Sequence, residues 1–208
     1  ETDENFKYRQ LKQDYFIRDL KRFSVFAVLV DSYGDITRLL KRLEANYKRT
    51  SIFISGSAEV YDPLSQMDGQ SFVHELSRKL AEAKNRIITG FGLGVGSAVI
   101  NGTLAYLNDV GKTISDEDIV MRPFPQVATG TTPLLDQWKA YRAAMMEHAG
   151  IAIFLFGNKK DGSGTIVTAN GMRQEFELAL EAGVKLLPIG ATGYMAAELW
   201  KEVKNGFV

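Results

Sequence analysis

From Ser51 onward, short apolar runs rich in β-branched residues alternate with segments long enough to form a helix. A glycine or a polar turn follows most of the runs. Strands and helices that alternate in this way form parallel sheets, because each crossover helix carries the chain back to the edge where the next strand starts. The pattern predicts a doubly wound, mainly parallel α/β sheet of the Rossmann-like class. We expect strands at 51–55, 86–89, 118–121, 150–155 and 185–189, and helices at 69–84, 94–109, 133–147, 171–182 and 195–204.

The first part of the chain has a different pattern. Residues 5–48 are rich in charged and long side chains, and their apolar residues recur near helical spacing. This predicts an N-terminal helical extension of two helices joined near residues 32–35. The apolar run 25–30 fits either a strand or a buried helix, and we favour the helix. The expected domains are therefore a helical lead-in at 1–48 and a nucleotide-binding domain at 49–208.

Composition excludes several function classes. Lys plus Arg and Asp plus Glu number 25 each, so no overall field attracts a nucleic acid or an anionic membrane. No apolar run approaches the roughly 20 residues that span a bilayer, and the N-terminus does not resemble a signal peptide, which favours a cytoplasmic location. The absence of cysteine and the presence of only two histidines make a metal site unexpected. We expect no nucleic-acid partner, no membrane partner and no bound metal.

Four alternate glycines follow the second expected strand and open the next helix, at positions 90, 92, 94 and 96. Without Cβ atoms, a loop of this kind lets backbone N–H groups and the positive end of a helix approach a phosphate closely. We therefore predict ligand contacts at Gly92, Leu93 and Gly94. Tight packing of a strand against a helix is the alternative, and the spacing does not match the dinucleotide fingerprint G-x-G-x-x-G.

Other candidates come from the remaining loops and helix ends. Gly56 and Ser57 end the first strand, where a small residue and a hydroxyl can face a ligand, although turn chemistry explains them equally well. Arg142 and Lys159 would suit a diphosphate if both face the glycine loop, but such residues are commonly solvated surface charges, and Lys160 competes with Lys159. Glu175 fits either the positive end of its helix or a ribose hydroxyl.

The chain resembles the SLOG branch of Rossmann-like nucleotide-binding proteins. The resemblance runs from about residue 51 to the end and rests on residues 88–96 and 156–175, which are similar to the family's two glycine motifs. In the family's enzymes the second motif is P-G-G-x-G-T-x-x-E, whereas here Phe156-Gly157-Asn158-Lys159 replaces the Pro-Gly-Gly turn and Met172 replaces the threonine. More closely, the chain is similar to the C-terminal sensor domain of Thoeris antiphage effectors.

This resemblance implies a function. The domain would bind a cyclic ADP-ribose isomer made by a TIR-domain protein and thereby activate NAD hydrolysis by an attached, upstream sirtuin-like domain. By motif position, Arg142, Lys159 and Glu175 match the ligand-contacting residues of the family. Residues 1–48 would be the tail of the upstream domain or its linker. We expect a homo-oligomer, a dimer for this fragment and a tetramer for the full-length protein, with no cofactor and no catalytic residue in the fragment.

Two other functions remain open at this point. The first is a phosphoribohydrolase of the cytokinin-activating, lysine decarboxylase-like type, which cleaves nucleoside monophosphates. There Glu175 would act near the ribose, with Arg122 or Arg142 assisting. The second is an assembly domain that binds no ligand.

Overall fold

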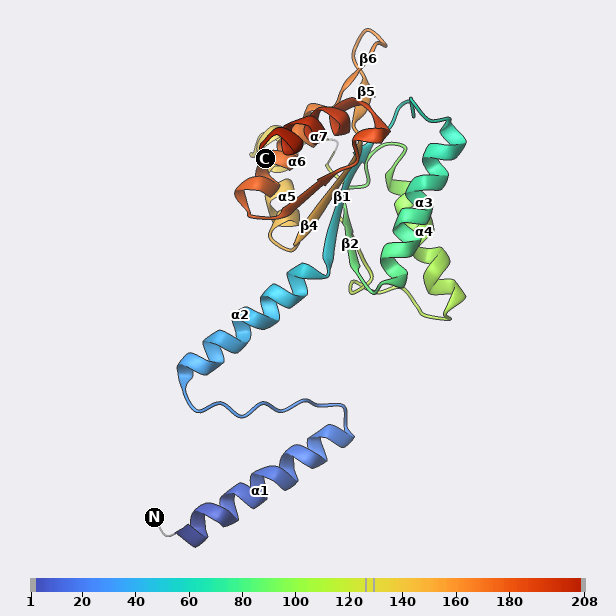
Figure 1. Cartoon of the computed structure of the whole chain (residues 1–208). Coiled ribbons are helices and arrows are strands. Elements are labelled where there is room, and N and C mark those ends of the chain that lie inside the picture. The colour runs from blue at the N-terminus through green and yellow to red at the C-terminus, as the bar shows by residue number, and fades with distance from the viewer. Residues whose placement is uncertain (1–2, 126, 129, 207–208) are drawn as a thin grey trace. The chain divides into compact units, whose positions relative to one another are not determined.

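A computed structural model describes residues 3–125, 127–128 and 130–206 of the chain (Figure 1). Backbone contacts divide the chain into two compact units, Glu1–Leu43 and Glu44–Val208. Among the described residues, no helix is both long enough and apolar enough to cross a membrane.

The first unit contains the helix α1 (Asp3–Arg22). It ends in a Schellman motif, in which the Val25 N–H donates to the Leu20 carbonyl and Ser24 adopts a left-handed conformation with φ 59°. Residues 25–30 form neither helix nor strand, so our prediction of a helix there was wrong. The turn at Ser24 stops the helix, and the three valines of the run have a low helix propensity because their χ1 angles are restricted.

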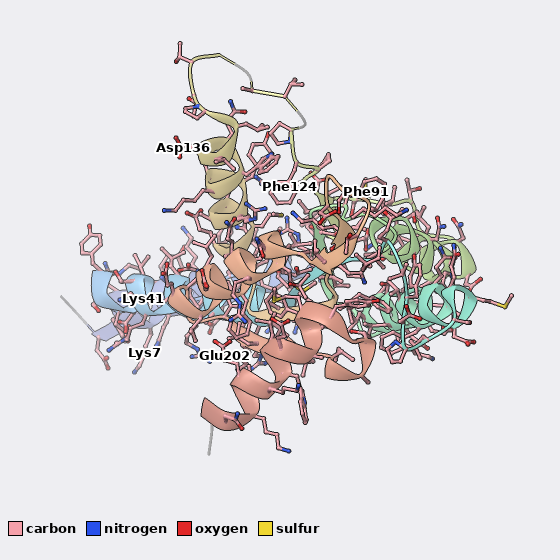
Figure 2. All side chains as sticks on the ribbon, turned by 90° about the horizontal axis from the view of Figure 1, so that it is seen from above. Lys7, Lys41, Phe91, Phe124, Asp136 and Glu202 are labelled. Atoms are coloured by element: carbon pink, nitrogen blue, oxygen red, sulfur yellow. The ribbon has the colours of Figure 1, made fainter. Side chains whose placement is uncertain are left out.

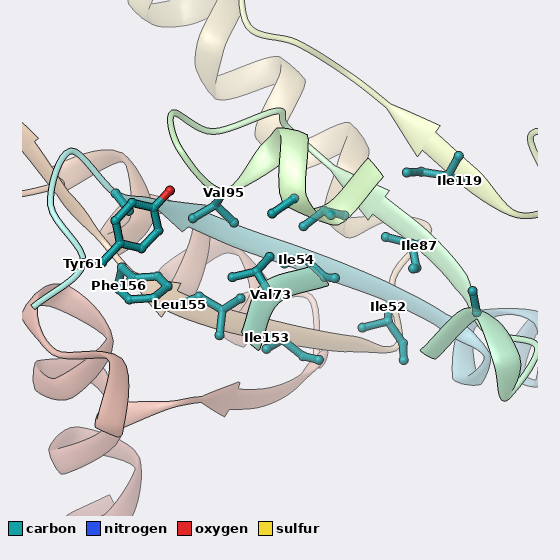
Figure 3. Close-up of a cluster of buried hydrophobic side chains, with 14 residues drawn as sticks. Ile52, Ile54, Tyr61, Val73, Ile87, Val95, Ile119, Ile153, Leu155 and Phe156 are labelled. Atoms are coloured by element: carbon teal, nitrogen blue, oxygen red, sulfur yellow. The ribbon is translucent and has the colours of Figure 1, made fainter. Parts of the chain in front are cut away.

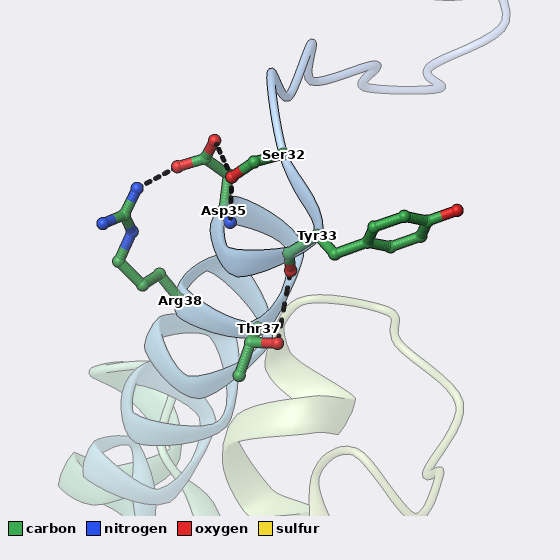
Figure 4. Close-up of polar contacts among 5 residues, drawn as sticks. All are labelled: Ser32, Tyr33, Asp35, Thr37 and Arg38. Atoms are coloured by element: carbon green, nitrogen blue, oxygen red, sulfur yellow. Dashed lines mark hydrogen bonds and ion pairs between the residues drawn. The ribbon is translucent and has the colours of Figure 1, made fainter.

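Helix α2 (Tyr33–Arg49) starts at the joint that the sequence predicts. The Asp35 backbone N–H donates to Ser32 Oγ over 3.3 Å, and the Ser32 hydroxyl donates to the Asp35 carboxylate over 2.8 Å (Figure 4). Arg38 pairs with the same carboxylate. These contacts satisfy N–H groups that a helix start leaves without partners, and they place negative charge where the helix dipole favours it.

The second unit contains a parallel sheet of five strands, which confirms the predicted fold class. The strand order is β3-β2-β1-β4-β7, and every neighbouring pair is parallel. In Figure 1, α3 and α4 lie on one side of the sheet and α5, α6 and α7 on the other. The strands are β1 (Ser51–Ser57), β2 (Arg86–Thr89), β3 (Ile119–Met121), β4 (Ile151–Phe156) and β7 (Lys185–Pro188).

The helices of the second unit lie within a few residues of their expected positions. They are α3 (Gln66–Glu82), α4 (Gly96–Asp109), α5 (Leu134–Met146), α6 (Asn170–Glu181) and α7 (Tyr194–Gly206), with a short 3₁₀ helix, η1, at Gly190–Thr192. The sequence pattern predicts no strand between residues 156 and 170, but the structure has an antiparallel hairpin there. It consists of β5 (Asn158–Lys160) and β6 (Ile166–Thr168) and is followed by the start of α6. The three-residue strands are too short to produce a recognisable alternation.

Each face of the sheet has its own hydrophobic core. Alternate residues of a strand point to opposite faces, so Ile52 and Ile54 join the cluster under α3 and α4, whereas Phe53 joins the cluster under α5, α6 and α7. Figure 3 shows the first cluster, which includes an edge-to-face contact of the Tyr61 and Phe156 rings with centroids 5.2 Å apart. Burial on both faces explains why the strands are continuous apolar runs rather than alternating ones.

Candidate functional site

The order of the sheet reverses at β1. This strand pairs with β2 on one side and with β4 on the other. The chain after β1 and β2 leads to α3 and α4 on one face, whereas the chain after β4 leads to α6 on the other (Figure 1). In open α/β sheets, ligands bind outside the carboxyl ends of the strands at such a switch point. Figure 2, a view from above, labels Phe91 in the loop after β2, Phe124 in the loop after β3 and Asp136 in the first turn of α5.

The glycine loop after β2 packs tightly against the loop after β1. A Cβ atom placed on Gly92 would lie 1.8 Å from the Gly56 carbonyl oxygen, and one placed on Gly94 would lie 2.2 Å from the Ala58 carbonyl oxygen. The Ala58 N–H donates to the Leu93 carbonyl over 2.8 Å. Backbone packing therefore requires glycine at two positions of this loop, whatever else the loop binds.

The same loop presents backbone donors without acceptors. Val95 precedes the first residue of α4, and no side chain caps the helix. Within the described residues, five N–H groups of this segment have no hydrogen-bond acceptor: those of Gly92, Leu93, Gly94, Ser97 and Ala98. Together with the partial positive charge of a helix N-terminus, such donors suit a phosphate group.

A buried polar cluster lies on the other face of the sheet and joins β1, α5 and α6. The Ser55 hydroxyl donates to Glu175 Oε2 over 2.5 Å, and Arg142 Nε lies 3.4 Å from Glu175 Oε1. Arg142 and Glu175 are each only 8% exposed. Burial raises the pKa of the Glu175 carboxyl, while the Ser55 hydrogen bond and the Arg142 charge oppose that change. The sequence singled out Arg142 and Glu175, and the fold brings them together.

The guanidinium of Arg142 is held on three sides. It lies over the Phe124 ring at 4.8 Å from the centroid, and a Cβ atom on Gly171 would lie 2.9 Å from Nη2. A Cβ atom on Gly90 would lie 2.7 Å from Phe124 Cε2, so Phe124 connects Arg142 to the first glycine of the loop. Within the described residues, the bond to Glu175 is the only hydrogen bond of this guanidinium. Its other donors suit an anion.

Asn158 is a structural residue that the sequence reasoning missed. It is fully buried, its Oδ1 accepts from the N–H groups of Glu59 and Val60, and its Nδ2 donates to the Val60 carbonyl. The hydroxyl of Ser57, which the sequence assigned to a ligand, donates to the Asn158 carbonyl over 3.0 Å. Asn158 thus ties the loop after β1 to the hairpin after β4. The sequence feature that could have indicated this role is an asparagine two residues after a buried strand.

The two lysines of the hairpin point to opposite faces, because they are neighbours on β5. Lys160 forms an ion pair with Glu59. Lys159 is exposed and has no ion pair or hydrogen-bonding side-chain partner within the described part of the chain. Lys159 is thus the lysine of the pair that is available to an external anion. Among the described residues, Lys159 forms no hydrogen bond or ion pair with Arg142 or with the glycine loop.

Arg122, which the sequence offers for the hydrolase alternative, and its surroundings lie beside β3. Arg122 lines a surface cavity of about 510 Å³ beside β3, together with Arg86 and Tyr141. Trp138 of α5 donates from Nε1 to the Pro125 carbonyl over 2.7 Å and so fixes the loop after β3. In the described part of the chain, no group of three His, Cys, Asp or Glu side chains could hold a metal ion.

The strand order, the two helix layers and the glycine loop at the switch point define a doubly wound α/β domain of the Rossmann-like class. The chain belongs to the Sir2- and TIR-associating SLOG family (STALD), whose family model matches residues 35–208.

Three relatives match all or nearly all of the chain. It is 45% identical to the NAD(+) hydrolase ThsA of Cytobacillus dafuensis and 42% identical to that of Bacillus cereus (strain MSX-D12), and each match covers 100% of this chain and 42% of the relative. The chain is 38% identical to the ThsA of Acinetobacter baumannii (strain 532279), of which it covers 44%. The chain therefore spans less than half the length of these relatives. The X-ray structure of TM1055 shares the fold, with a TM-score of 0.50 and 15% identity over 73% of this chain and 80% of that one.

Proposed function

We propose that this chain is a regulatory sensor domain that binds a cyclic ADP-ribose isomer. Binding would activate NAD hydrolysis by an attached sirtuin-like domain in Thoeris antiphage defence. One observation carries the proposal: Arg142 is a buried guanidinium whose donors are satisfied by the protein only at Nε, within the described residues. Glu175 already pairs with Nε, and the remaining donors of the arginine fork match the oxygens of a phosphate.

The proposed ligand has a diphosphate, and the domain offers several sources of positive potential. The free N–H groups at Gly92, Leu93 and Gly94 would bind phosphate oxygens. Arg142 and Lys159 would neutralise the two charges. Glu175 would accept from the ribose or the adenine edge with the lone pairs that Ser55 and Arg142 leave open, and it holds Arg142 in place.

The link to NAD hydrolysis rests on the relatives. The proteins that match the whole chain are named NAD(+) hydrolases, and this chain corresponds to 42% of the length of two of them. The family name records an association with Sir2 and TIR domains. We therefore place hydrolysis in an attached sirtuin-like domain, assign synthesis of the signal to a TIR-domain protein, and expect a dimer of this fragment and a tetramer of the full-length protein.

Activation requires a part of the molecule that differs between two arrangements, because a ligand shifts an equilibrium only through its different affinities for the two states. The β5–β6 hairpin is our candidate. It carries Lys159 at the proposed ligand and is tied through Asn158 to the loop after β1.

Calorimetric titration of the purified chain with cyclic ADP-ribose isomers tests the proposal. NAD, ADP-ribose and AMP serve as comparison ligands, and chromatography of the ligand after the titration shows whether it stays intact. We expect micromolar or tighter binding of one cyclic isomer and its recovery unchanged. If no cyclic isomer binds, the sensor function is wrong.

The phosphoribohydrolase alternative makes a different prediction for the same experiment, namely release of free adenine from AMP. That chemistry needs a carboxylate that reaches the ribose. Because the Glu175 carboxylate is already bonded to Ser55 and Arg142, its remaining lone pairs suit a hydrogen bond from a ligand hydroxyl better than attack on a substrate.

A further inference from the structure

Phe91 has a backbone conformation that is unfavourable for its side chain. Its φ is 57°, in the left-handed region, although it stands between Gly90 and Gly92 in a loop where glycine is common. A bulky residue in this region is unusual, and glycine would adopt the same conformation without strain. Phe91 is also 49% exposed, so burial in the core compensates for little of the strain. The needs of the fold therefore do not explain why an aromatic residue, rather than glycine, occupies this position.

The surroundings hold this ring at the open end of α4. The Phe91 N–H donates to Thr89 Oγ1 over 3.2 Å, which fixes the backbone at the end of β2. A Cβ atom on Gly96 would lie 2.8 Å from both Cα and Cδ2 of Phe91, so the ring lies against the first residue of α4. The next two residues, Ser97 and Ala98, carry N–H groups without acceptors in the described part of the chain. An exposed aromatic ring and a set of phosphate donors thus lie side by side.

We propose that Phe91 is the stacking platform for the base of the bound nucleotide. The inference rests on the proposed function and adds to it the residue that recognises the base. Every nucleobase has a π face that stacks on an aromatic ring, and a phosphate held at the start of α4 would bring a base of the same ligand within reach of Phe91. Phe124, the other labelled aromatic of this region in Figure 2, lies under the Arg142 guanidinium and has a structural partner already.

The Phe91→Gly variant separates stacking from folding, because glycine removes the ring and relieves the backbone strain together. We expect its melting temperature to stay at or above that of the wild type. Its affinity for the cyclic ADP-ribose isomer should fall about tenfold or more, since stacking contributes substantially to single-base recognition. The Phe91→Trp variant should keep an affinity within about threefold of the wild type, and its added indole emission should be quenched by the ligand because a stacked base quenches indole fluorescence.

The outcomes distinguish the two proposals. If the wild type binds the isomer and Phe91→Gly binds it equally well, the stacking role is wrong while the sensor function stands. The stacking role is also wrong if Phe91→Gly changes only the oligomeric state in light scattering, which would assign the ring to contact with a second copy. If the wild type binds no cyclic isomer, the proposed function itself fails.

Discussion

Arg142 and Glu175 form an ion pair that is buried at the edge of the sheet where the strands end, with Arg142 Nε 3.4 Å from Glu175 Oε1. The Ser55 hydroxyl completes the group. Removing one member of a buried pair leaves an uncompensated charge and commonly costs about 3–5 kcal/mol of stability. Any effect of these residues on ligand binding must therefore be measured together with the free energy of unfolding.

The Glu175 carboxyl should make stability depend on pH. Burial raises its pKa in the folded chain above the ordinary value of 4.5, so the native state binds the proton more tightly than the unfolded state. The free energy of unfolding should then fall as pH rises from the ordinary value through the raised one, by up to about 1.4 kcal/mol per pH unit. Urea unfolding of the wild type and Glu175→Gln over about pH 4–8 measures this. A difference between the two that does not change with pH would contradict the raised pKa.

Gly92 should not tolerate alanine. The added Cβ would meet the Gly56 carbonyl oxygen, and neither backbone can yield without separating the two loops. We expect a loss of about 1–3 kcal/mol in the free energy of unfolding, as for other overpacked sites, and weaker ligand binding. Gly162→Ala is the matched control, because nothing lies within 4 Å of the added Cβ. Equal stability of the two variants would show that the loops separate easily.

Asn158 should matter for stability although it contacts no proposed ligand atom. Its side chain satisfies two N–H groups and one carbonyl of the loop after β1, all of which Asn158→Ala would leave without partners. A buried unsatisfied group costs about 1–3 kcal/mol, and these three are part-buried, so we expect a total loss of about 2 kcal/mol by urea unfolding. The exposed Asn101 on α4 provides a control, Asn101→Ala, for which we expect little change. A small effect at Asn158 would mean that the loop finds other partners.

The fold was predictable because the strands of a parallel sheet are buried on both faces and therefore stand out as continuous apolar runs. The hairpin at 158–168 was not, because two strands of three residues carry no periodic signal. The run 25–30 was interpreted wrongly because its end is set by a turn at Ser24 that hydrophobicity does not reveal.

The site was predictable only in part. Arg142 and Glu175 were found as motif residues, but their mutual contact depends on how α5 and α6 pack, which the sequence does not specify. The glycine loop was found for its phosphate chemistry, whereas half of its glycine content reflects contact with Gly56 and Ala58. Ser55 was passed over in favour of Ser57, because nothing in the sequence shows which hydroxyl faces a carboxylate.

The two lysines of the hairpin should differ in ligand binding. Lys160 is paired with Glu59 and shares a strand face with Asn158, whereas Lys159 is unpaired within the described residues and lies on the other face. If Lys159 neutralises a phosphate, Lys159→Ala should weaken binding of the cyclic isomer about tenfold, as expected for loss of a charge-assisted contact. Lys160→Ala should have little effect, since exposed ion pairs contribute about 0–1 kcal/mol. A larger loss of affinity in Lys160→Ala than in Lys159→Ala would show that Lys160 contacts the ligand instead.

The central claim is that Arg142 holds an anionic nucleotide, and calorimetric titration of a cyclic ADP-ribose isomer into the wild type, Arg142→Ala and Arg173→Ala tests it most directly. Arg173 is a control on the neighbouring helix α6 that pairs with Glu202. Circular dichroism confirms that each variant is folded at the temperature of the titration. We expect micromolar or tighter binding to the wild type and to Arg173→Ala, and an affinity lower by about tenfold or more for Arg142→Ala. Equal affinity of the wild type and a folded Arg142→Ala variant would contradict the account.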